Sequence, residues 1–318
     1  MEYRKIEGLE TPLSRIVMGG SSSGMRKGEN CDEILDAALS FGINTFDTAR
    51  GYGKSEEVLA DWADRRGVRD RILIQTKGAL HGMLGNNRVN VKCIRKDFEA
   101  SLRALRTDCI DIYILHRDNE KTPVAPIVDL LNEFQAKGLL KIFGGSNWSY
   151  RRFEEANEYA YKHGLSPMRI SEPHYSLAEV NRWAWIGCTT LTGEAHMEER
   201  AWYEKTGFPL VAFSPLAGGF MTGRIKSDDY QRTVKNVSFD MRRTFATEKN
   251  RERLKRAERL AKEKGCAVSQ IALAWVLESP MNTFAIIGNS RVSTMKMSID
   301  SLAIKLTAEE RAYLNLED

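Results

Sequence analysis

The sequence predicts an α/β fold, a closed (β/α)8 barrel of the TIM type with an N-terminal β-hairpin. Short, continuously apolar runs alternate with longer helical patterns along the chain, and eight such runs can be counted. Eight strand–helix units are the number at which a parallel barrel closes. The alternative is an open doubly wound sheet. No Gly-x-Gly-x-x-Gly turn follows the first strand, although that turn marks many dinucleotide-binding sheets of this kind. We therefore favour the barrel.

The individual elements can be placed in order. The hairpin is expected within residues 1–15, with strands at residues 4–6 and 9–12 and a turn at Glu7 and Gly8. Runs as short and apolar as those that follow are typical of parallel strands with both faces buried. The barrel strands are expected at residues 16–18, 43–46, 72–77, 110–116, 141–146, 168–172, 210–213 and 283–287. The helices, several of which end at a glycine, are expected at residues 30–41, 54–66, 90–105, 126–137, 150–162, 197–205, 247–264, 267–277 and 307–314.

The composition is that of a globular protein, with 42% hydrophobic and 28% charged residues among 318. Because α/β barrels of more than about 250 residues form one domain, we expect a single domain over residues 1–318. The net charge of +4 comes from interleaved basic and acidic residues, which argues against a nucleic-acid partner. No apolar run reaches the roughly 18 residues of a membrane span, so no membrane association is expected. The oligomeric state is left open.

The cysteines indicate a reducing compartment. Five of them, at positions 31, 93, 109, 188 and 266, are scattered and form no Cys-x-x-Cys pair. Such thiols are typical of intracellular proteins, and the first residues lack the apolar core of a secretory signal. We therefore expect a cytoplasmic protein. Histidine and cysteine spacing gives no metal site, so no metal is expected.

Four polar side chains fall where a barrel keeps its chemistry, at the carboxyl ends of its strands. Asp47 follows the second strand, Lys77 ends the third and His116 ends the fourth, while Tyr52 lies between two glycines in the turn after Asp47. An ammonium near a phenol lowers the pKa of the phenol, a carboxylate keeps the ammonium charged, and an imidazole can bind a substrate oxygen. Together these groups suit protonation of an oxygen while hydride reaches a carbonyl carbon.

A hydride requires a donor, and the later strand ends suit a dinucleotide. Ser146 and Asn147 follow the fifth strand and could hold a carboxamide, while Phe213 offers a flat ring for a nicotinamide. The small residues at 214–219 let backbone N–H groups approach a pyrophosphate. Residues 287–291 lead into a short helix, whose N-terminus would favour a phosphate. We therefore expect a nicotinamide dinucleotide across the barrel mouth.

Taken together, these motifs resemble the aldo-keto reductase family over nearly the whole chain. The resemblance rests on four groups of residues, namely Asp47-x4-Tyr52 with Lys77 and His116, Gly145-Ser146-Asn147, Ser214-Pro215-Leu216-Ala217-Gly218-Gly219, and Ile287-Gly288-x-Ser290-Arg291. It implies an NADP(H)-dependent enzyme acting on a small-molecule carbonyl or alcohol, such as an aldehyde or a ketone. It also implies Tyr52 as the general acid and base, with His116 orienting the carbonyl. The mix of aromatic rings and polar loops around the expected pocket also fits a sugar-like carbonyl.

The resemblance further implies which residues contact the cofactor. They are Gly19, Gly20, Ser21, Asp47, Ser146, Asn147, Glu172, Phe213, Ser214, Pro215, Leu216, Gly218, Arg224, Ile287, Gly288, Ser290, Arg291 and Thr294. The substrate pocket is expected to draw on Met25, His81, Met83, Trp148, Trp183 and Trp185.

Three features depart from the pattern of the family. Glu172 stands where glutamine is usual, and a carboxylate can accept from a carboxamide N–H but cannot donate to its oxygen. Phe213 stands where tyrosine is common, which changes stacking little. Thr294, Met297 and Ser298 stand where longer polar residues usually contact the adenosine, so NAD(H) stays possible beside NADP(H).

A second function is also compatible with these motifs. Some relatives in this family are cofactor-binding regulatory subunits that attach to a membrane channel and turn over slowly. The expected cofactor site alone does not separate such a redox sensor from an enzyme. Turnover that depends on Tyr52 would distinguish them.

Overall fold

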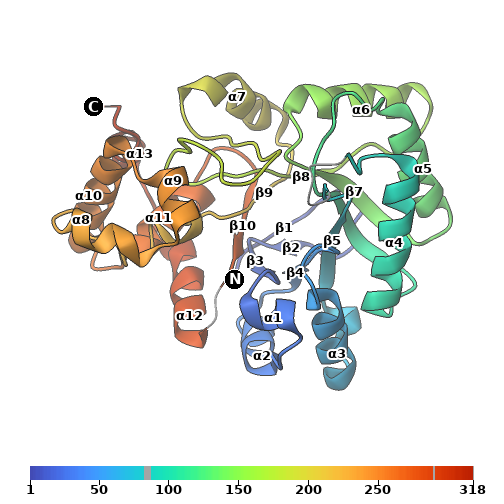
Figure 1. The fold of residues 1–318 in the computed structure, drawn as a ribbon, viewed down its shortest axis with the longest axis horizontal. Coiled ribbons are helices and arrows are strands. Elements are labelled where there is room, and N and C mark those ends of the chain that lie inside the picture. The colour runs from blue at the N-terminus through green and yellow to red at the C-terminus, as the bar shows by residue number, and fades with distance from the viewer. Residues whose placement is uncertain (82–86, 289–290, 318) are drawn as a thin grey trace.

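The computed structural model describes residues 1–81, 87–288 and 291–317, and its centre is a closed barrel of parallel strands (Figure 1). The strands follow one another around the barrel in the order β10-β3-β4-β5-β6-β7-β8-β9. Their bounds are β3 Ile16–Gly19, β4 Thr45–Asp47, β5 Leu73–Gly78, β6 Ile110–Leu115, β7 Leu140–Ser146, β8 Ile170–Glu172, β9 Leu210–Ala212 and β10 Thr283–Ile287. The predicted (β/α)8 barrel is therefore confirmed.

Helices surround the strands (Figure 1). Those expected from the sequence are α2 Asp32–Ser40, α3 Ser55–Arg66, α4 Val91–Leu105, α5 Ala125–Ala136, α6 Tyr150–Lys162, α7 Met197–Thr206, α10 Glu248–Glu263, α11 Val268–Leu277, α12 Val292–Asp300 and α13 Ala308–Asn315. Three short helices were not predicted, α1 Ser23–Lys27, α8 Tyr230–Thr233 and α9 Phe239–Phe245. Each is too short for its apolar residues to show a helical period.

Alternation along the strands divides the core into two layers. Within β6, Ile112 and Ile114 belong to the cluster inside the barrel, whereas Tyr113 and Leu115 pack with the helices outside. Both faces of the strand are therefore buried. This is why the barrel strands are continuously apolar in the sequence.

The N-terminal hairpin closes one end of the barrel. Its strands are β1 Tyr3–Arg4 and β2 Leu13–Ser14, which pair antiparallel. The hairpin itself was predicted, but of the expected strands at residues 4–6 and 9–12 only Arg4 lies in a strand. Ile6 and Leu9 instead insert into the interior cluster of the barrel, so burial of these side chains displaces strand pairing. The hairpin covers the amino end of the barrel and leaves the carboxyl ends of the strands as its mouth.

A close approach between two strands fixes the residue at position 144. A Cβ on Gly144 would collide with the backbone oxygen of Ile170 in the neighbouring strand. A glycine in β7 therefore lets β8 come near enough to pair. This places Ser146 opposite Glu172 at the mouth. Among the described residues, no helix is both long and apolar enough to cross a bilayer.

Candidate active site

The carboxyl ends of β4, β5 and β6 bring three of the predicted catalytic residues together. Asp47 is the last residue of β4, Lys77 lies near the end of β5, and His116 directly follows β6. Strand pairing places Asp47 beside Gln75 and Lys77 beside Ile114. All three predicted side chains are buried, and the Lys77 side chain has 0% of its surface exposed.

Tyr52 reaches the same place from the turn between β4 and α3. Its N–H donates to the Ala49 oxygen at 2.9 Å. Gly53 has a φ of 60°, and a Cβ there would lie 2.5 Å from the backbone oxygen of Arg26. A side chain at position 53 would therefore open the turn. The Tyr52 ring meets the His116 ring edge-on, with the centroids 5.6 Å apart.

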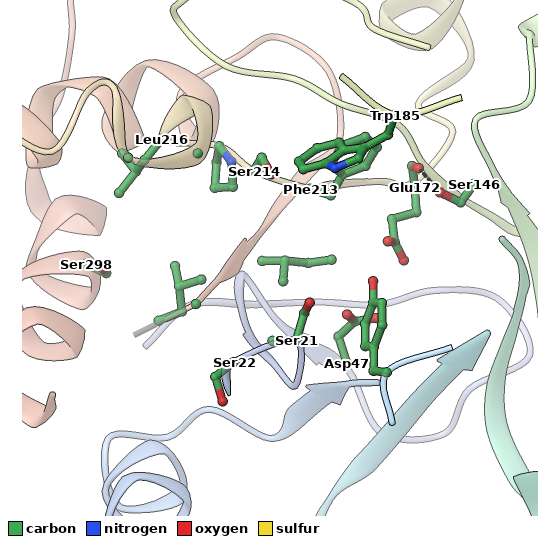
Figure 2. Close-up of a pocket in the computed structure, with 18 of the residues that line it drawn as sticks. Ser21, Ser22, Asp47, Ser146, Glu172, Trp185, Phe213, Ser214, Leu216 and Ser298 are labelled. Atoms are coloured by element: carbon green, nitrogen blue, oxygen red, sulfur yellow. Dashed lines mark hydrogen bonds between the residues drawn. The ribbon is translucent and has the colours of Figure 1, made fainter. Parts of the chain in front are cut away.

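The Lys77 ammonium lies between two carboxyl groups. It forms an ion pair and a short hydrogen bond with Asp47, and its Nζ lies 3.3 Å from the Glu172 Oε1. It also donates to the Thr48 backbone oxygen at 3.1 Å. Figure 2 shows the Glu172 carboxylate extending from its strand toward Asp47. The sequence predicted the Asp47 pairing but assigned Glu172 only to cofactor contact. Its link to Lys77 depends on side-chain positions that the sequence does not show.

The predicted effect of Lys77 on the Tyr52 phenol is present in this structure, but burial outweighs it. The Lys77 Nζ lies 5.2 Å from the centre of the Tyr52 ring, and its charge does lower the pKa of the phenol. Desolvation has the larger effect, and the carboxylates of Asp47 and Glu172 add to it, so the pKa of Tyr52 rises to about 12. The lowering of the Tyr52 pKa by one ammonium is therefore smaller than the rise caused by burial and two carboxylates.

His116 is held as a neutral imidazole. Burial lowers its pKa well below the ordinary value, and the nearby charges of Lys77 and Arg117 lower it further. Its Nδ1 is buried and has no hydrogen-bond partner among the described residues. A neutral ring can donate one hydrogen bond from whichever nitrogen carries the proton. It can therefore donate a hydrogen bond to a carbonyl oxygen, and it is not an imidazolium that would protonate that oxygen in place of Tyr52.

A cavity of about 790 Å³ extends from Tyr52 and His116 to the start of α12. All the predicted cofactor-contact residues line it except Gly20 and Ser290. Gly20 lies behind the cavity wall, where its backbone N–H donates to the backbone oxygen of Asp47. Ser290 lies outside the described residues. Figure 2 shows lining residues from this cavity, including Ser21, Ser214 and Leu216.

The substrate-pocket prediction was largely wrong. Trp185 lines the cavity, whereas Met25, His81, Trp148 and Trp183 do not. The Met25 and Trp148 side chains are buried in the core at 2% and 1% exposed. The Trp148 indole donates to the Arg117 backbone oxygen at 3.1 Å, so it is a packing residue.

The remaining predicted pocket residues are held elsewhere. Trp183 packs edge-on against His174, with the centroids 5.1 Å apart, and stacks on Trp185. It therefore supports the cavity wall from behind. The His81 Nε2 lies 3.0 Å from the Ile186 oxygen. Met83 lies outside the described residues.

Some lining residues were missed. Arg117 directly follows His116, and Leu80 lies just beyond the end of β5, so their positions at strand ends could have indicated them. Cys188 also lines the cavity, but it lies in a long loop where the sequence carries no comparable signal.

Ser146 and Asn147 present a polar edge to the cavity. The Ser146 hydroxyl donates to the Glu172 backbone oxygen at 2.7 Å, and the Asn147 amide donates to Ser146 at 2.9 Å. The Asn147 Oδ1 accepts from the Thr189 N–H at 3.0 Å. Because an amide oxygen has two lone pairs, it can still accept from a carboxamide.

The opposite end of the cavity suits phosphate groups. Ser214, Ala217, Gly218 and Gly219 all have positive φ, and such runs can turn backbone N–H groups toward an anion. At Gly218 a Cβ would collide with the Met241 sulfur, so the chain needs glycine here. The N-cap residue of α12 makes no side-chain hydrogen bond to its first turn. Arg224 and Arg291 also line this end. These features fit a dinucleotide.

The fold and cavity define a barrel protein with a buried acid–base cluster at one end of a groove suited to a dinucleotide. The chain belongs to the aldo/keto reductase family, whose family model matches residues 15–316. Membership implies NAD(P)H-dependent oxidoreductase activity on a small-molecule substrate. Within the described ranges, no group of three metal-ligating side chains is present.

Known proteins resemble the chain over almost its full length. It is 30% identical to the uncharacterized oxidoreductase YrpG of Bacillus subtilis (strain 168), over 99% of this chain and 95% of that protein. It is 28% identical to the probable aryl-alcohol dehydrogenase AAD4 of Saccharomyces cerevisiae (strain ATCC 204508 / S288c), over 90% and 87%. The crystal structure of the thermostable aldo-keto reductase Tm1743 with the inhibitor epalrestat has the same fold, with a TM-score of 0.73, 22% identity and 99% coverage of both chains.

Proposed function

We propose that this protein reduces an aldehyde or ketone with NADPH, and catalyses the reverse oxidation of an alcohol, with Tyr52 as the acid and base. One observation carries the proposal: Tyr52 and His116 line the end of a cavity whose other end suits phosphate groups. A bound reduced nicotinamide would supply the hydride. Residues 1–318 would act as a single cytoplasmic domain.

Each of the side chains around the cavity would have a separate role in the reaction. Phe213 offers its ring to the nicotinamide, and Asn147 offers an acceptor to the carboxamide. His116 donates a hydrogen bond to the carbonyl oxygen, which orients the substrate and polarises the C=O bond. Tyr52 then transfers its phenolic proton to that oxygen as negative charge develops on it, a contribution typically worth about 10²–10⁴ in rate. Lys77 stabilises the phenolate that remains.

The geometry of the mouth guides the choice of substrate. Trp185, Leu80 and Cys188 give it an apolar wall, while Arg117 adds one cation. An aromatic aldehyde would pack against the indole, and the name of the AAD4 relative also suggests aryl substrates. Sugar-like carbonyls, expected from the sequence, are the second class.

The proposal is tested by following NADPH consumption with a panel of aryl aldehydes, ketones and sugars. Turnover of at least one class that depends on Tyr52 would support the enzyme. Tight NADPH binding without turnover of any compound would favour the regulatory subunit. Failure to bind either nicotinamide cofactor would reject both functions.

The choice between NADP(H) and NAD(H) depends on the cations at the far end of the cavity. We expect Arg291→Ala to weaken NADPH binding by about 10- to 100-fold, because a charge-assisted hydrogen bond is worth about 1.5–3 kcal/mol. NADH, which lacks the additional phosphate, should be little affected. Fluorescence titration of both cofactors measures this ratio. Arg259→Ala, on an exposed part of α10, is the matched control, and equal weakening of both cofactors would contradict the prediction.

A further inference from the structure

Glu172 occupies a more central place than a cofactor contact requires. It is the last residue of β8, and its side chain is buried. Its Oε1 lies 3.3 Å from the Lys77 Nζ, and its Oε2 accepts from the Gln75 Nε2 at 2.7 Å. The same Gln75 nitrogen donates to the Asp47 Oδ1 at 2.8 Å. Two carboxyl groups therefore share one ammonium and one amide.

The charges in this cluster do not balance when both carboxyl groups are ionised. Asp47 and Glu172 would carry two negative charges against the single positive charge of Lys77, because His116 is neutral. Arg117 adds a cation on the cavity wall, but it forms no ion pair with either carboxyl group among the described residues. An unbalanced buried charge is costly, and such sites commonly take up a proton instead.

Glu172 is the better place for that proton. Asp47 has the closer contact with Lys77, which favours its ionised form. Burial raises the pKa of Glu172 to about 8, with Lys77 opposing this shift and the charge of Asp47 adding to it. The carboxyl group of Glu172 would therefore change its protonation at mildly alkaline pH.

We propose that Glu172 is a positioning residue whose proton sets the charge around Lys77 and thereby how readily Tyr52 releases its own proton. The inference rests on the proposed function of Tyr52. When Glu172 is neutral, the positive charge of Lys77 and the negative charge of Asp47 cancel, and the ammonium can stabilise a phenolate at Tyr52. When Glu172 is ionised, its negative charge repels the negative charge of the phenolate. It also competes with the phenolate for the Lys77 ammonium.

The proton of Glu172 does not enter the reaction. During reduction a hydride, which a bound reduced nicotinamide would supply by breaking its own C–H bond and becoming oxidised, forms the new C–H bond at the carbonyl carbon. The electron pair of the broken C=O π bond moves to the oxygen. That oxygen takes the proton from Tyr52, and the phenolate regains one from solvent through the cavity. Glu172 changes only the electrostatic field in which this transfer occurs.

The first test compares the pH dependence of kcat/KM for carbonyl reduction in the natural protein and in Glu172→Gln. The like charge of an ionised Glu172 disfavours the Tyr52 phenolate, and one pKa unit corresponds to about a tenfold change, so we expect kcat/KM of the natural protein to fall about tenfold as the pH rises past about 8. Glutamine keeps the length of the side chain and cannot ionise. The variant should therefore lack this fall.

The matched control is Glu56→Gln. Glu56 is also a buried carboxyl group, but it accepts from Thr76, pairs with Arg50 and does not line the cavity. This variant should keep the fall in kcat/KM. An unchanged pH profile in Glu172→Gln, beside clear turnover, would overturn the role of Glu172 and leave the proposed function intact.

The second test needs neither cofactor nor turnover. Infrared difference spectroscopy of the cofactor-free protein should show a protonated carboxyl band that disappears with a midpoint near pH 8, and Glu172→Gln should lack it. A band absent from the natural protein, or retained in the variant, would refute the proposal. If the natural protein shows no turnover, the proposed function fails, and the infrared titration still decides the state of Glu172.

Discussion

Replacing Tyr52 with phenylalanine is expected to lower kcat for carbonyl reduction by about 10²–10⁴-fold, the usual contribution of a positioned general acid. Only the hydroxyl group is removed, so the ring keeps its edge-on contact with His116 and its place near Lys77. The phosphate end of the cavity is unaffected. Affinity for the cofactor should therefore stay within about twofold, because no hydrogen bond to it is lost.

Single-turnover kinetics and fluorescence titration separate these two effects. Tyr161→Phe is the matched control, since Tyr161 is 64% exposed on the outer surface. If Tyr52→Phe retains full activity, another group must supply the proton. An equal loss in Tyr161→Phe would point to a general effect of handling or folding.

Replacing Lys77 with methionine is expected to destabilise the fold by about 3–5 kcal/mol at neutral pH, the usual cost of removing one partner from a buried ion pair. The substitution leaves the carboxyl groups of Asp47 and Glu172 buried without the ammonium between them. Activity should also be lost, because the ammonium nearest the Tyr52 ring would no longer stabilise the phenolate.

The loss of stability in Lys77→Met should depend on pH with a definite sign. Burial already raises the pKa values of both carboxyl groups, and removing the ammonium raises them further. The folded variant therefore binds protons more tightly than the unfolded chain, so its stability falls as pH rises through the folded pKa values. Urea denaturation should show the smallest defect near pH 5 and the largest near pH 9, as rough limits.

A double variant tests the cause of this defect. Adding Glu172→Gln to Lys77→Met removes one of the two unpaired carboxylates, so part of the lost stability should return at high pH. A defect that grows as the pH falls would contradict the electrostatic explanation. So would a double variant that is less stable than Lys77→Met alone.

The barrel could be predicted because its strands are buried on both faces. Ile112 and Ile114 point into the interior while Tyr113 and Leu115 face the helices, so the whole segment is apolar in the sequence. Strand ends then had to meet at one rim, which brought Asp47, Lys77 and His116 together by topology alone.

Contacts that depend on side-chain direction could not be predicted. Trp148 lies at a strand end like the predicted catalytic residues, but its indole turns away from the cavity toward the Arg117 oxygen. Glu172 was recognised as unusual, yet its ion pair with Lys77 joins β8 to β5 across the barrel. The hairpin strands were misplaced because Ile6 and Leu9 fill the barrel interior. There they pack against strand residues that are distant in the sequence.

The hairpin side chains that fill the base of the barrel, Ile6, Leu9 and Leu13, have a practical consequence. Because they occupy the base of the barrel, the N-terminus leaves the molecule on the side away from Tyr52. A purification tag or a surface linker joined to Met1 would therefore leave the mouth facing solution. Immobilised protein attached in this way should retain access for both the dinucleotide and its substrates.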